Sequence, residues 1–168
     1  TQQIELNIGK VEEKLDLLPT FLAISDQLLN QLLKLSTAVL VQEEAIAEED
    51  LKNVEEMHRK LLLEGQQVLN QASTPMAEHV EQLMRILTVG VSAVEAYTKQ
   101  PHTSYAWQIQ QAGLNYLFQY ERLLDWMTKV SFSAPSTSDA LLRYQQCIVR
   151  EATEIYRYLL GFSLNQYK

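Results

Sequence analysis

The sequence contains one cysteine, five glycines and four prolines in 168 residues. Cys147 therefore has no partner within the chain, which excludes a disulfide scaffold and fits a reducing compartment. No run approaches the about 18 apolar residues that a membrane span needs, and residues 1–3 do not form a signal peptide. These absences lead us to expect a cytoplasmic protein with no transmembrane segment.

Positive charge is also scarce, with 14 Lys and Arg against 21 Asp and Glu, for a net charge of −7. Contact with nucleic-acid phosphates needs Lys and Arg gathered on one face, and no such cluster occurs in the sequence. A hydrophobic content of 46% excludes a disordered chain. We expect a globular protein with no nucleic-acid partner.

The length fits one domain spanning 1–168, because about 150 residues is near the usual domain size and such a chain hides roughly 70% of its unfolded surface. The sequence begins at Thr1 rather than at Met. This favours a domain excised from a longer protein, or a processed form.

Apolar residues recur at helical spacing throughout, without the strict alternation of strands. Residues 20–71 could form one helix or two. The acidic residues Glu48, Glu49 and Asp50 favour a break at 45–47, because acidic side chains stabilise the start of a new helix. Pro19 should break or kink the segment before it. The expected helices cover residues 20–43, 48–71, 74–98, 103–130 and 139–162, after a short amphipathic segment at 4–18. Thr74 is the expected cap of the third helix, with Pro75 in its first helical position. The fold class is an all-α, up-and-down bundle of four to five long antiparallel helices plus that short N-terminal helical segment.

Chemistry-bearing motifs are sparse. Glu55 and His58 form Glu-x-x-His, half of the motif of di-iron bundles, but neither His79 nor His102 supplies a second copy. The five glycines are isolated and form no phosphate-cradling loop, and Cys147 is expected to be a buried, inert thiol. Gly90, Ala93 and Gly113 are suited to close approach of helices. We therefore expect no catalytic residues, no metal and no cofactor, and so no enzyme.

Aromatic residues are crowded into one half of the chain. Of 2 Trp, 8 Tyr and 4 Phe, only Phe21 precedes Tyr97. Large rings could simply fill one end of the bundle, or they could line a groove or interface. The run 116–118 distinguishes these two possibilities. Three consecutive helical residues point about 100° apart and cannot all face one neighbour, so either the helix is central in the bundle or part of its surface meets a partner or ligand. The candidate partner- or ligand-binding residues are Tyr105, Trp107, Tyr116, Phe118, Tyr120, Trp126 and Tyr156.

Long Gln-rich and Leu-rich helices with acidic turns resemble helical adaptor, sensor and phasin-like bundles alike. The leading hypothesis is a non-catalytic interaction module that acts through protein contacts or self-association, as a homo-oligomer, through helices 103–130 and 138–162. One alternative is a sensor or carrier that binds a small hydrophobic ligand between those helices. Another is a phasin-like coat on a membrane or hydrophobic granule, which the shortage of Lys and Arg disfavours for anionic lipid.

Overall fold

The computed structural model describes residues 15–40, 45–131 and 150. Within these residues the chain is all-α, and its regular elements are four long helices with no strand. The helices are α2 (Leu18–Leu40), α3 (Glu48–Gln71), α4 (Thr74–Lys99) and α5 (Thr103–Ser131).

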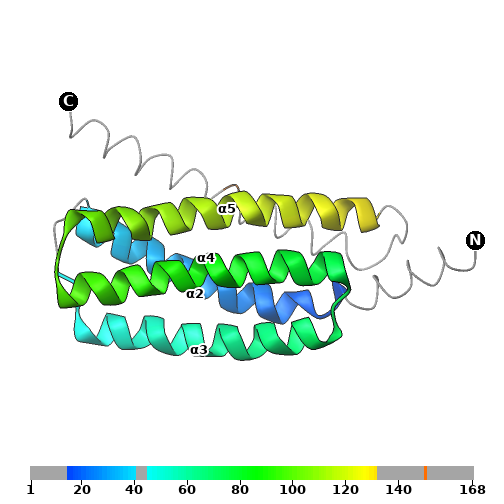
Figure 1. Cartoon of the computed structure of the whole chain (residues 1–168), viewed down its shortest axis with the longest axis horizontal. Coiled ribbons are helices and arrows are strands. Elements are labelled where there is room, and N and C mark those ends of the chain that lie inside the picture. Colours follow the sequence, from blue (N-terminus) through cyan, green and yellow to red (C-terminus); the bar gives the residue numbers. More distant parts are fainter. Residues whose placement is uncertain (1–14, 41–44, 132–149, 151–168) are drawn as a thin grey trace, which may run out of the picture.

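The four helices form a bundle in which consecutive helices run in opposite directions (Figure 1). α4 packs most extensively against α5, and α2 packs against both α3 and α5. Connections of two or three residues join α3 to α4 and α4 to α5, which places each pair side by side. Apart from Arg150, which is helical, the expected helix 139–162 lies outside the described residues, and so do residues 4–14 of the expected segment 4–18.

The predicted break between the first two helices is confirmed. Residues 45–47 are not helical, and α3 begins at Glu48 after an extended Ala47. The three acidic residues predicted to favour this start occupy the first turn of α3. α2 begins at Leu18, directly after a turn at 16–17, so Pro19 falls in its first turn, where the backbone donor that proline lacks has no intrahelical partner.

The predicted cap of α4 is wrong by one residue. Ser73 is the N-cap, with an extended backbone, and Thr74 is already helical. Pro75 lies within the first two helical positions, where it removes no intrahelical hydrogen bond. The Ser73 side chain makes no cap hydrogen bond, so the start of α4 depends on proline and on packing.

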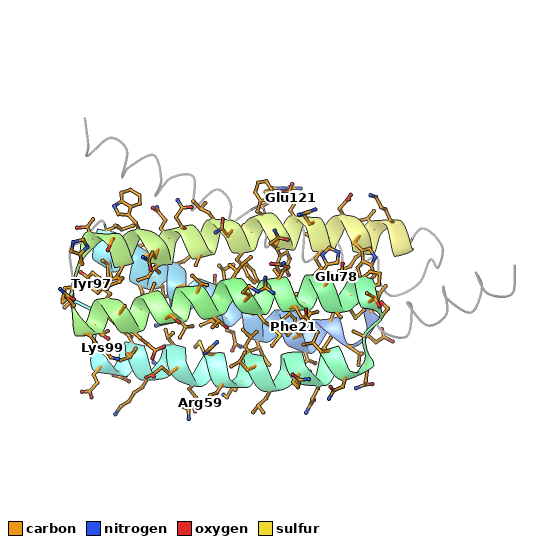
Figure 2. All side chains as sticks on the ribbon, in the orientation of Figure 1. Phe21, Arg59, Glu78, Tyr97, Lys99 and Glu121 are labelled. Carbon is orange, nitrogen blue, oxygen red and sulfur yellow. The ribbon has the colours of Figure 1, made fainter. Side chains whose placement is uncertain are left out.

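The core contains two rows of apolar side chains from α2 but essentially one stripe of apolar side chains from α3. α2 buries both Leu28 and Leu29 and both Leu32 and Leu33, whereas Leu63 of α3 is 70% exposed. In Figure 2, Arg59 of α3 points out of the bundle and Phe21 of α2 lies among the helices. α2 is therefore covered on two sides, as its two apolar rows predict.

Gly90 of α4 lies where three helices meet. A methyl group at this position would stand 2.9 Å from Leu32 Cδ1 of α2 and 3.1 Å from Ala112 Cβ of α5. The absence of a side chain allows the backbone of α4 to approach both neighbours. The described part of the chain has no helix long and apolar enough to cross a membrane.

Candidate functional site

Three consecutive residues of α5 differ sharply in burial. Tyr116 is fully buried, Leu117 is 5% exposed and Phe118 is 70% exposed. Since successive helical residues point about 100° apart, α5 is covered on two sides and presents a third side to solvent. This outer side of α5 carries the labelled Glu121, which lies away from α4 (Figure 2).

Exposed side chains follow one line along this outer side. The line, here named the outer stripe, advances by alternating steps of four and three residues, and every member is exposed. This is the spacing of residues that face one neighbour along a helix. Phe118 is the one apolar member. The outer stripe consists of Gln111, Asn115, Phe118, Arg122, Asp125 and Lys129.

A surface groove of about 490 Å³ lies beside Phe118. Phe118 and Trp126 contribute rings from α5, and His79 contributes a ring from α4. The His79 and Trp126 rings are in contact, with centroids 5.5 Å apart and planes tilted by 36°. The groove is thus an aromatic depression between two helices. Its remaining lining residues are Glu121, Arg122, Asp125 and Lys129.

The groove carries balanced charge, with two carboxylates and two cations at its rim. Lys129 Nζ lies 3.2 Å from Asp125 Oδ2. Both side chains are exposed, so this pair adds little to stability. Burial lowers the pKa of His79, and the nearby Arg122 charge lowers it further while Glu78 opposes the shift. Burial and Arg122 thus favour the neutral form of His79, whose ring acts as an aromatic wall of the groove.

The structure divides the candidate residues into three groups. Phe118 and Trp126 both line the groove. Tyr116 and Tyr120 lie in the core with ring centroids 5.5 Å apart. The half-buried candidates on the first turns of α5 are Tyr105 and Trp107, and Tyr156 lies outside the described residues.

Sequence reasoning missed the contribution of α4 and the charged rim. In the sequence His79 bears only on a metal motif, and no motif contains Arg122 or Asp125. The sequence does contain a signal for this side of α5. The residues of the outer stripe recur at heptad spacing, but most of them are polar, and a search for apolar patterns does not detect them.

A polar cluster is buried between α2 and α5. The Tyr116 hydroxyl donates to Ser25 Oγ at 2.7 Å, and Ser25 donates to the carbonyl of Leu22 at 3.0 Å. Beside them, burial raises the pKa of Asp26 to about 7. Burial also raises the pKa of Tyr116, an effect that the Asp26 charge adds to and the bond to Ser25 opposes. These groups hold the two helices together, and no described feature opens them to a ligand.

His58, the histidine of the half-motif, is engaged by a neighbouring helix. Its Nε2 lies 2.8 Å from Thr88 Oγ1 of α4. Because the Thr88 hydroxyl donates to the Met84 carbonyl at 2.8 Å, the Nε2–H of His58 is the donor to Thr88. Among the described residues, no group of three or more His, Cys, Asp or Glu could hold a metal ion.

Comparison of the chain with protein-family models, with curated proteins and with solved structures found no match. The groove and the outer stripe are therefore the features of the protein that indicate a function.

Proposed function

We propose that this protein is a non-catalytic helical-bundle interaction module that binds a protein partner, or itself, through the outer side of α5. The observation that supports this proposal is Phe118, which is 70% exposed near the middle of a 29-residue helix and beside a groove of about 490 Å³. An exposed aromatic ring next to an aromatic groove is typical of a binding hot spot.

The lining of the groove favours a protein partner over a small hydrophobic ligand. Small-molecule sites usually enclose most of the ligand surface, whereas this groove lies open on the surface with four charged side chains at its rim. The buried tyrosine that could have oriented a ligand, Tyr116, bonds to Ser25 instead. A protein segment with an apolar anchor and polar flanks matches the lining better.

Two finer expectations remain part of this proposal. The predicted helix 138–162, with Tyr156, is a second contributor to the interaction and would extend the up-and-down bundle to five helices. We also expect the protein to lie in the cytoplasm, so its partner would be a cytoplasmic protein.

Site-specific photo-cross-linking in the cells that naturally make the protein tests the proposal. A benzophenone amino acid at position 118 should give a discrete adduct that mass spectrometry identifies. The matched control is position 63, since Leu63 on α3 is also 70% exposed. Equal labelling at both positions, or no adduct at 118, would contradict the proposal.

A further inference from the structure

The outer stripe has the geometry of one half of a two-helix pair. Its steps of four and three residues alternate, which is the heptad spacing at which two helices keep contact along their length. From Gln111 to Lys129 it spans about 27 Å at 1.5 Å per residue. The helices α2, α3 and α4 leave all six of its members exposed.

We propose that the occupant of the outer stripe and groove is α5 of a second copy of this chain, packed antiparallel about a two-fold axis near Tyr120. This inference rests on the proposed function and names its partner. The dimer is isologous, so each copy offers the same surface and every contact occurs twice.

The antiparallel register follows from the spacing of the stripe. Two such helices align so that residues whose numbers add to 240 lie opposite each other, which gives six successive layers. Phe118 of each copy faces Arg122 of the other, Asn115 faces Asp125, and Gln111 faces Lys129.

Each layer combines side chains that can bind one another. The guanidinium of Arg122 can lie over the Phe118 ring of the other copy in a cation–π contact. The amide of Asn115 can donate to the Asp125 carboxylate, and the amide oxygen of Gln111 can accept from the Lys129 ammonium. No layer places two charged residues opposite each other.

A parallel pair would have the opposite outcome. It would place Arg122 against Arg122, Asp125 against Asp125 and Lys129 against Lys129. Like charges held directly opposite are unfavourable, so the distribution of charge along α5 selects the antiparallel arrangement. Charge is confined to the C-terminal half of the stripe, and amides occupy the N-terminal half.

The groove provides the space that the second Phe118 needs. It extends along α5 from Phe118 past Arg122 to Lys129, with Trp126 and His79 as aromatic walls. In the proposed register, Phe118 of one copy meets Arg122 of the other, within this lined region. The exposed Phe118 ring of each copy therefore enters the aromatic depression of its partner, as a knob enters a hole.

Sedimentation velocity on the purified chain over a wide concentration range provides the first test. The expected result is a concentration-dependent dimer that Phe118→Asp weakens at least about tenfold, which corresponds to about 1.4 kcal/mol. The matched control Leu63→Asp, at an equally exposed position on α3, should leave dimerisation unchanged. A monomer at every concentration, or equal weakening by both substitutions, would overturn the proposal.

Disulfide trapping tests the register. In a Cys147→Ser background, one sample carries Asn115→Cys and a second, isotopically labelled sample carries Asp125→Cys. Mixing under mild oxidation should give mainly the mixed dimer, because position 115 of one copy lies opposite position 125 of the other. Position 115 of one copy lies about 15 Å along the helix axis from position 115 of the other, too far for a disulfide. Predominance of either homodimer would rule out the antiparallel register.

The two proposals fail in distinguishable ways. A monomer whose position 118 still cross-links to another identified protein would overturn the dimer and leave the interaction module intact. A monomer with no adduct at position 118 would overturn both.

Discussion

Tyr116 and Ser25, 91 residues apart in sequence, are joined in the core by a hydrogen bond of 2.7 Å from the tyrosine hydroxyl to the serine oxygen. Because the Ser25 hydroxyl donates a hydrogen bond to the Leu22 carbonyl, the two bonds together link the Tyr116 side chain of α5 to the backbone of α2. It is a polar connection at the centre of an apolar bundle, and it joins α5 to α2 on the side of α5 that carries Tyr116.

Replacing Tyr116 with Phe should lower the free energy of unfolding by about 1 kcal/mol, since one buried hydrogen bond is lost and the ring remains. Urea unfolding measures the change. Tyr105→Phe is the control, because Tyr105 is only half-buried and should change stability by less than about 0.5 kcal/mol. Equal effects at the two positions would contradict a special role for the Ser25 bond.

Asp26 should make stability depend on pH. Its pKa is about 7 in the folded protein and 3.8 as the reference value. Between these pH values the folded state keeps a proton that the unfolded state releases, so the free energy of unfolding falls as pH rises from about 4 to about 7. The contribution of Asp26 is fully present below that window and lost above it.

Asp26→Asn should therefore flatten this pH dependence and stabilise the protein at about pH 8. The gain is at most roughly 4 kcal/mol, since each pH unit between the two pKa values contributes about 1.4 kcal/mol. Urea unfolding at about pH 5 and pH 8 compares the two proteins. Asp16→Asn, at an exposed position, should not alter the profile; an unchanged profile in Asp26→Asn would refute the assignment.

Gly90→Ala should destabilise the bundle by about 1 kcal/mol. Crowding against Ala112, whose methyl group is fixed to the backbone, outweighs the gain in helix propensity. Adding Ala112→Gly opens the space again, so the double variant should lose less stability than the two single variants together. Simple additivity in chemical denaturation would show that the two methyl groups do not compete for this space.

Gln110→Met should stabilise the protein by about 1 kcal/mol. Gln110 is fully buried, and neither atom of its amide has a hydrogen-bond partner among the described residues. Replacing such a group with an apolar side chain of similar length removes the cost of burying it. Gln108→Met, at an exposed position, serves as the control in thermal unfolding. A loss of stability at 110 would mean that the amide has a partner beyond the described residues.

Helix positions could be predicted from the sequence because each helix keeps apolar residues at helical spacing along its length. The acidic start of α3 and the proline near the start of α4 marked the boundaries between helices. The cap of α4 was misplaced by one residue because Ser73 and Thr74 are both good caps, and only the backbone angles distinguish them.

The site was less accessible to sequence reasoning. The run at 116–118 indicated that one residue points outward, but which one depends on the rotation of α5 against α2 and α4. The groove also joins His79 to Trp126, which are 47 positions apart in the chain, so no local pattern contains it. Burial of Asp26 and Gln110 was hidden because polar residues on a helix are normally read as its solvated side.

Trp126, which contacts His79 in the groove, can serve as a fluorescent reporter of the groove. Trp126 and Trp107 are the two tryptophans of the chain, so Trp107→Phe would leave the groove tryptophan as the sole indole fluorophore. Its emission would then follow water leaving the groove as copies associate, and assembly could be monitored in solution without any attached label.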